Sequence, residues 1–183
     1  MKREEALAYL QQHLKNDHLI KHSLAVESIM RGLARHLGED ETEWGLTGLL
    51  HDIDYESTAD DPNRHSLVGA EMLTDAGFPS GVVYAVKVHN EAHNLPRISQ
   101  LDKALFAADP TSGFITAAAL VRPEKQLAFV EVKSLKKRFK EKSFAKGANR
   151  DNMASCTELG LELEEFLALS LAAMQQDAEQ LGL

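Results

Sequence analysis

Apolar residues recur at helical spacing along almost the whole chain, and patterns typical of strands are scarce. The clearest segment runs from Asn16 or Asp17, either of which can cap a helix, to Gly38, which can end one. Its apolar stripe consists of Leu19, Val26, Ile29, Leu33 and Leu37, and His22 falls within it. These features predict an all-α protein that folds as a compact multi-helix bundle.

The next segments carry helix signals of their own. Residues 41–53 form a second expected helix. Asp61 followed by Pro62 is typical of a helix start, and this third helix would end near Gly77. Pro79 then opens a fourth helix.

The second half of the chain is less uniform. Ser99 and Asp102 resemble a capping box for a further helix, which Pro110 would interrupt or kink. Residues 124–144 suit a helix except that FVEV alternates as a strand does, so both interpretations stay open there. Residues 161–181 form a clear amphipathic helix.

The composition limits the class of protein. A length of 183 residues suits one compact domain, and 44% apolar with 26% charged residues is ordinary for a soluble globular protein. No apolar run is long enough to span a membrane and no signal peptide is recognisable, so we expect a cytoplasmic protein without a membrane partner. Cys156 is the only cysteine, so any metal must be held by histidine and carboxylate.

The charge is unevenly distributed. The formal net charge of −8 argues against general affinity for nucleic acid, so no nucleic-acid partner is expected. Residues 122–150 hold ten Lys and Arg against three Glu, which gives this segment +7 and the remainder −15. Such a run is commonly a solvated helix face. Arg122, Lys125 and Arg150 are nevertheless candidates to bind a phosphorylated ligand, because they lie beside turn residues and arginine grips phosphate in a bidentate fork.

Residues 49–55, LLHDIDY, place ionisable side chains directly after an apolar run. Burying such groups is costly unless they are paired or bind a metal. A single histidine on an apolar stripe is more often a hydrogen-bonded core residue than a ligand, so the argument rests on a set. Its members lie on or at the end of the apolar faces of several expected helices: His22, His51, Asp52, His65, His89 and Asp109. A helical bundle builds metal sites in this way, from side chains that point inward.

The order of these residues resembles the HD superfamily of metal-dependent phosphohydrolases. His22 matches the first histidine of the family. His51 and Asp52 match the doublet that names it, and Asp109 in LFAADP matches the closing aspartate. The resemblance implies that these four residues are the core metal ligands and that the bundle is of the HD type.

His65 and His89 match two further histidines of the subgroups that hold two metals. These subgroups include cyclic dinucleotide phosphodiesterases and symmetrical dinucleoside tetraphosphate hydrolases, and residues 65–109 look especially like the latter. Ile-Asp-Tyr at 53–55 replaces the glycine and lysine that follow the doublet in the cyclic dinucleotide enzymes, which weakens that interpretation. Pro110 follows the closing aspartate, where many members have lysine or tyrosine.

The resemblance covers about residues 17–115. We therefore expect a single HD-type domain over residues 1–183, with a C-terminal helical extension over residues 122–183. VRPEK at 121–125 and FAKGANRDN at 144–152 resemble a subgroup of predicted HD hydrolases whose substrate the sequence does not name. The oligomeric state is left open.

The implied ligand set divides between two metals. Catalytic Asp52 would bridge them, with His22, His51 and Asp109 on one and His65 and His89 on the other. Mixed imidazole and carboxylate ligands suit one or two ions of iron, manganese, zinc or cobalt better than magnesium or calcium. A bound divalent metal lowers the pKa of water towards about 7, and this supplies a hydroxide that attacks a phosphoester.

Three nearby residues have supporting or unrelated roles in this scheme. Asp54 and Glu56 follow the doublet closely enough to accept hydrogen bonds from ligand imidazoles or to accept a proton, although both could equally decorate a solvent loop. His93 lies one turn after His89, and we expect it to be an exposed or helix-terminal residue rather than a ligand.

The expected function is hydrolysis of a phosphomonoester or phosphodiester in a small phosphorylated compound, with a nucleotide or dinucleotide as substrate. A second class of function is oxidative, because some similar proteins use the same ligand set for a di-iron oxygenase. A third is a non-catalytic regulatory HD module. Degenerate modules of that kind typically lose ligands, whereas all six are present here.

Overall fold

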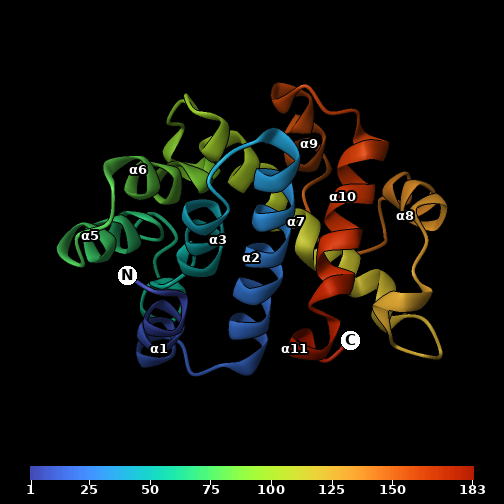
Figure 1. Cartoon of the computed structure of the whole chain (residues 1–183), viewed down its shortest axis with the longest axis horizontal. Coiled ribbons are helices and arrows are strands. Elements are labelled where there is room, and N and C mark those ends of the chain that lie inside the picture. The colour runs from blue at the N-terminus through green and yellow to red at the C-terminus, as the bar shows by residue number, and fades with distance from the viewer.

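A computed structural model describes residues 1–183, and all its regular elements are helices (Figure 1). The α-helices are α1 (Arg3–His13), α2 (Asp17–Leu37), α3 (Glu41–Leu50), α4 (Tyr55–Thr58), α5 (Leu67–Asp75), α6 (Ser80–His89), α7 (Gln100–Leu120), α8 (Val132–Phe139), α9 (Arg150–Ala154), α10 (Leu163–Gln176) and α11 (Ala178–Leu181). The 3₁₀ helices are η1 (Glu91–His93), η2 (Leu127–Phe129) and η3 (Ser155–Leu159). The all-α bundle expected from the sequence is confirmed.

Helix α2 lies at the centre of the bundle. In Figure 1 it has α3, α5 and α6 on one side and α10 on the other, while α7 runs behind it. The approach of α3 to α2 depends on Gly48, because a Cβ atom there would lie 2.9 Å from the carbonyl oxygen of Val26. This close packing brings the end of α3, and with it the HD doublet, against α2.

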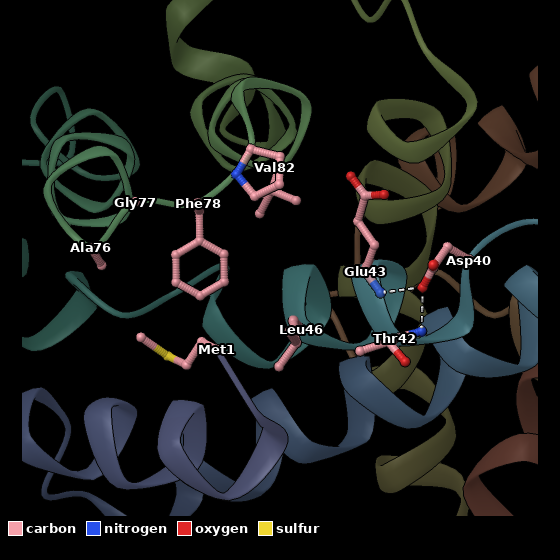
Figure 2. A pocket seen from close by; sticks show the side chains of 10 residues that line it. Met1, Asp40, Thr42, Glu43, Leu46, Ala76, Gly77, Phe78 and Val82 are labelled. Carbon is pink, nitrogen blue, oxygen red and sulfur yellow. Dashed lines mark hydrogen bonds between the residues drawn. The ribbon is translucent and has the colours of Figure 1, made fainter.

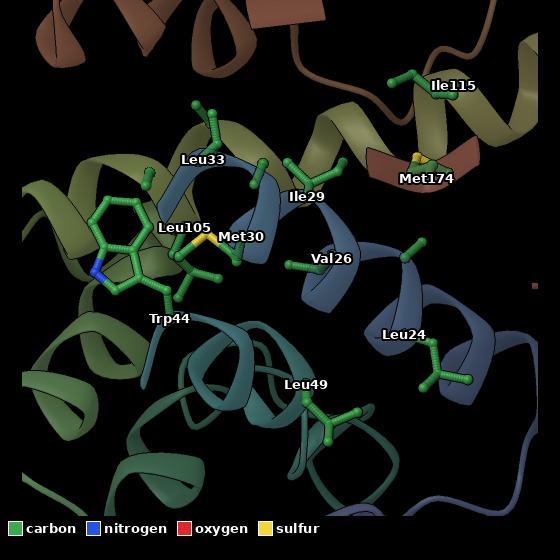
Figure 3. Close-up of a cluster of buried hydrophobic side chains, with 14 of the residues drawn as sticks. Leu24, Val26, Ile29, Met30, Leu33, Trp44, Leu49, Leu105, Ile115 and Met174 are labelled. Atoms are coloured by element: carbon green, nitrogen blue, oxygen red, sulfur yellow. The ribbon is translucent and has the colours of Figure 1, made fainter. Parts of the chain in front are cut away.

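A single cluster of forty buried apolar side chains joins the helices. Figure 3 shows Trp44 of α3 beside Met30 of α2, with Leu105 of α7 close by. Leu105 and Met30 are fully buried, and burying one such side chain contributes about 1.5–3 kcal/mol. The core therefore fixes the relative positions of α2, α3 and α7 around the doublet His51–Asp52.

Several expected helix ends are confirmed. Asn16 caps α2 by accepting a hydrogen bond from the backbone N–H of His18, and Gly38 ends it with a φ of 76°. The Ser99–Asp102 capping box starts α7. That helix continues through Pro110, so the interruption considered for this position does not occur.

The expected start of a helix at Pro62 is wrong, because α5 begins only at Leu67. The preceding residues form turns, and Ser66 has a φ of 68°, in the left-handed region. A helix cannot pass through a residue in that conformation. The FVEV stretch is not a strand either: it contains the end of η2 and the first residue of α8. No helix combines the length and hydrophobicity needed to cross a bilayer.

Candidate metal centre

The structure brings the six predicted ligands into one cluster. They come from α2 (His22), the turn after α3 (His51 and Asp52), the turn before α5 (His65), the last residue of α6 (His89) and the middle of α7 (Asp109). Most of these segments are helix ends rather than helix interiors. A helix end lets a side chain leave the regular stripe and reach the centre of the bundle.

The carboxylate of Asp52 lies between two pairs of imidazoles. Its Oδ2 is 3.5 Å from Nε2 of His22 and 3.4 Å from Nε2 of His51. Its Oδ1 is 3.3 Å from Nε2 of His65 and 3.3 Å from Nε2 of His89. One buried carboxylate therefore faces four imidazole nitrogens.

A second carboxylate closes one end of the cluster. Asp109 Oδ1 is 3.1 Å from Nε2 of His22 and 3.8 Å from Nε2 of His51. Ligand atoms of His22, His51 and Asp109 lie close enough together to hold a metal ion, and so do those of His51, Asp52 and His89. The two groups share His51.

Backbone carbonyls orient two of the imidazoles. Nδ1 of His51 donates to the carbonyl of Gly48 at 2.8 Å, and Nδ1 of His89 donates to that of Val86 at 2.6 Å. A carbonyl can only accept, so both Nδ1 atoms carry the hydrogen. In a neutral ring, Nε2 is then left with a lone pair that faces the centre of the cluster.

Side chains orient the other two imidazoles in the same way. Nδ1 of His65 is 3.0 Å from Oδ1 of Asp54, which accepts its hydrogen. Nδ1 of His22 is 3.0 Å from Oγ of Ser112, whose own hydroxyl donates to the carbonyl of Asp109. Outer partners of this kind are typical of histidines that ligate metals.

The donor set fits a divalent transition metal. Four inward Nε2 atoms face carboxylate oxygens, and neither a neutral imidazole lone pair nor a carboxylate can donate a hydrogen bond to the other. Such a cluster requires either added protons or a cation between the two kinds of acceptor. Imidazole with carboxylate is a ligand mix suited to iron, manganese, zinc or cobalt.

Without a metal, protons stabilise the cluster. Burial lowers the pKa of the His65 imidazole, but hydrogen bonds to Asp52 and Asp54 outweigh this and raise it to about 10. Burial works against ionisation of Asp52, yet the neighbouring imidazoles hold the pKa of its carboxyl well below the usual range. Burial lowers the pKa of His51. Metal binding would therefore displace a proton from His65.

Asp54 is fully buried and anchors the turn before α5. Its Oδ2 accepts hydrogen bonds from the backbone N–H of Ser66 at 2.8 Å and of Gly69 at 2.9 Å. A Cβ at Gly69 would lie 3.2 Å from Cγ of Asp54, so a larger residue there would crowd this carboxylate. These bonds explain the left-handed Ser66 and the late start of α5.

Local sequence patterns identified neither Ser112 nor Asn90 as a supporting residue. Ser112 could be found only from its helical spacing of three residues after Asp109. His93 donates from Nε2 to the carbonyl of His65 at 2.8 Å, and Asn90 donates to the same carbonyl at 3.2 Å. His93 is half-buried, and it supports the backbone of a predicted ligand rather than joining the set.

Glu56 lies outside the cluster. Its carboxylate accepts hydrogen bonds from the backbone N–H groups of Lys15 and Asn16, at 3.0 and 2.7 Å, and so holds the turn before α2. No hydrogen bond joins it to a predicted ligand imidazole. Of the two carboxylates predicted to support the imidazoles, only Asp54 contacts one.

The three predicted phosphate-binding cations do not contact the cluster. Arg122 pairs with Glu124 at 3.4 Å, and Lys125 is exposed. Arg150 is half-buried, and its guanidinium donates to several backbone carbonyls of its own loop and stacks over the ring of Phe114. In this conformation, the donors of Arg150 stabilise the chain and are not directed at a ligand.

Two cavities flank Asp109. One, of about 230 Å³, is also lined by His65 and His89, and the other, of about 340 Å³, by His22. Pro110 and Gly147 line both. The cluster is therefore accessible from two sides of one aspartate.

A further groove lies between α3 and α6, away from the cluster (Figure 2). Phe78, Leu46 and Val82 supply its apolar part. It contains none of the six clustered residues. We therefore assign it no role in the chemistry of the cluster.

Comparisons with known proteins place the chain in a family. The family described as HD domain matches residues 19–113, which is more than half of the chain. The chain is similar to Ribonuclease Y of Oleidesulfovibrio alaskensis (32% identity over 54% of this chain and 18% of the relative) and of Lawsonia intracellularis (29% over 56% and 19%). It is also similar to Ribonuclease Y of Clostridium novyi (31% over 73% and 27%). The chain thus spans about a fifth to a quarter of these relatives, and by its match over residues 19–113 it belongs to the HD domain family.

Proposed function

We propose that the protein is a metal-dependent hydrolase of a small phosphorylated compound, and that this compound is a nucleotide. The observation that carries the proposal is the position of Asp52, whose two oxygens each face the Nε2 atoms of two imidazoles. Membership of the HD domain family supports hydrolysis, and the curated relatives are named as ribonucleases, which cleave a polymer of nucleotides.

The ligands divide into two groups around Asp52. His22, His51 and Asp109 would hold one metal and His65 and His89 the other, with Asp52 bridging the two. Bound iron, manganese, zinc or cobalt supplies a water of lowered pKa and positive charge opposite the phosphate oxygens. Ser112 and Asp54 fix the imidazole orientations.

The two cavities support a small substrate. Pockets for drug-sized ligands measure roughly 300–1,000 Å³, and the cavities beside Asp109 are about 230 and 340 Å³. Asp109 is 32% exposed in its side chain and lies where both cavities meet the cluster. We infer that the phosphoryl group lies at Asp109, with the rest of the substrate in the cavities.

Metal analysis and hydrolysis assays test the proposal together. Protein purified without added metal should contain about two equivalents of a transition metal, matching the two ligand groups. It should hydrolyse p-nitrophenyl phosphate, bis-p-nitrophenyl phosphate or a 5′-nucleotide, lose this activity to a chelator and recover it with manganese.

The alternatives give different results. Oxygen consumption coupled to product formation, with iron as the only active metal, would indicate an oxygenase. A loaded centre that hydrolyses none of these esters would indicate a regulatory module. Faster cleavage of an RNA oligonucleotide than of any mononucleotide would overturn the proposal of a small substrate. It would not overturn the proposal that the protein is a hydrolase.

A further inference from the structure

The cavity beside His65 and His89 has a distinctive wall. Away from the predicted ligands it is lined by three asparagines and one glutamate, namely Asn90, Glu91, Asn149 and Asn152, together with Pro110 and Gly147. No lysine, arginine or large apolar side chain lines it. Away from the predicted ligands, the surface of the cavity is therefore almost entirely hydrogen-bonding, and Glu91 carries its one negative charge.

The wall joins two distant parts of the chain. Glu91 belongs to η1, directly after α6, while the two later asparagines belong to the start of α9. Oε2 of Glu91 accepts a hydrogen bond from Nδ2 of Asn152 at 3.2 Å and from Nδ2 of Asn149 at 3.5 Å. The C-terminal extension thus completes a cavity whose metal-facing side comes from the motif core.

The loop that leads into this wall is held in place by Arg150. The guanidinium donates to the carbonyls of Phe144, Ala145 and Ala148, and also to that of Phe139 at the end of α8. Ala145 has a φ of 44°, in the left-handed region that non-glycine residues rarely adopt. Strained backbone held by such contacts is common at ligand-binding sites. The loop places Gly147 in the lining of both cavities.

The chemistry of the wall selects the class of ligand. Unlike Asp109, Glu91 is not one of the predicted metal ligands, so its carboxylate would repel a phosphate and favours an uncharged part of the ligand at this wall. Carboxylates accept hydrogen bonds from sugar hydroxyls, as the acidic residue of dinucleotide-binding folds does from a ribose 2′-hydroxyl. A carboxamide can both donate to and accept from a hydroxyl.

We propose that this wall binds the ribose of the nucleotide substrate while the phosphoryl group lies at the cluster. Glu91 Oε1 and Asn152 Oδ1, which take part in no hydrogen bond within the protein, would accept hydrogen bonds from the ribose hydroxyls. This assignment rests on the proposed function and adds a substrate specificity to it. The protein would hydrolyse ribonucleotides in preference to 2′-deoxyribonucleotides. A cavity of about 230 Å³ is of a size for a sugar rather than for a whole nucleotide.

The test compares hydrolysis of the four 5′-ribonucleotides with that of their 2′-deoxy counterparts, with p-nitrophenyl phosphate as an ester without sugar. For the wild-type protein, kcat/KM for at least one ribonucleotide should exceed that for its deoxy analogue by at least about tenfold, because a polar site that loses its partner hydroxyl binds poorly. Asn152→Ala and Glu91→Gln should reduce this ratio to within about threefold of unity, mainly through KM for the ribonucleotide.

Gln12→Ala is the matched control, because it removes an exposed carboxamide from α1 that lines neither cavity. It should keep the full ratio, and the metal content of all variants should equal that of the wild type. Equal hydrolysis of ribo- and deoxyribonucleotides by the wild type, or a ratio unchanged in both wall variants, would overturn the ribose assignment while leaving the hydrolase intact. Failure to hydrolyse any ester, p-nitrophenyl phosphate included, would instead remove the proposed function and the ribose assignment with it.

Discussion

The two ends of the cluster are held by different means. At one end, His22 and Asp109 lie within the long helices α2 and α7, and their side chains are 24% and 32% exposed. At the other, His65 lies in a turn and depends on the fully buried carboxylate of Asp54. Regular helix packing therefore positions the first end, whereas at the second end one buried carboxylate positions His65.

This difference predicts unequal sensitivity to substitution. The first end is supported by the apolar core, which no single outer partner controls. The second end concentrates its support in Asp54, which bonds an imidazole and two backbone N–H groups at once. We therefore expect one substitution to abolish metal binding at both ends, one to weaken it at the second end, and one to change it little at the first end.

Asp52→Ala should have the largest effect because this residue contacts both ends. We expect metal content to fall at both sites and activity on p-nitrophenyl phosphate to fall by more than about 100-fold, beyond what loss of an outer partner causes. Elemental analysis and steady-state assays measure the two losses. Retention of both metals by a folded Asp52→Ala protein would contradict the bridging position.

Asp54→Asn should weaken the second end selectively. The neutral amide is a poorer acceptor for His65 and turns a donor towards backbone N–H groups, so metal affinity at this end should fall by about 10–100-fold. Chelator competition should show one tight and one weakened site. His89→Ala is the reference, since it should remove the second metal entirely. Equal weakening at both ends by Asp54→Asn would show that the ends are not independent.

The stability of the metal-free protein should depend on pH through the second end. The pKa of His65 is about 10 when folded and about 6.5 in the unfolded chain, so the protonated imidazole stabilises the fold fully below pH 6.5. This contribution is lost as pH rises towards 10, and the free energy of unfolding should fall by about 1–3 kcal/mol.

Urea titrations between pH 6 and 10 measure this change. The metal-loaded protein should show a smaller decrease, because the cation takes the place of the proton. His65→Gln should remove most of the alkaline loss from the metal-free protein. If the metal-free wild type had the same free energy of unfolding at pH 6 and at pH 10, this would contradict the raised pKa of His65.

Ser112→Ala should have the smallest effect. It removes the acceptor for Nδ1 of His22, but that imidazole is partly exposed and water can replace the hydroxyl. We expect less than about a tenfold loss of metal affinity at the first end, measured by the same chelator competition. A loss equal to that of Asp54→Asn would remove the distinction between the two ends.

The sequence alone predicted much of the fold and the membership of the cluster. The bounds of α2 followed from its cap, stripe and glycine, which are local signals. The six clustered residues followed from their order, which resembles that of the HD superfamily, and His65 was included although it lies in a turn and not on the helix expected for it. The predicted start of α5 was wrong. The observed start is set by Asp54, which lies twelve residues before Ser66 and accepts a hydrogen bond from its backbone N–H.

Only the tertiary structure decided which other groups meet the cluster. Ser112 reaches His22 across 90 residues of sequence, and Asn152 reaches Glu91 across 61. In the sequence, the positive charge of Arg150 suits a phosphate-binding residue, but in the fold its donors bind the carbonyls of its own loop. Local patterns report periodicity and capping because these depend on neighbours along the chain. Contacts between distant polar groups arise only when the core has brought their helices together.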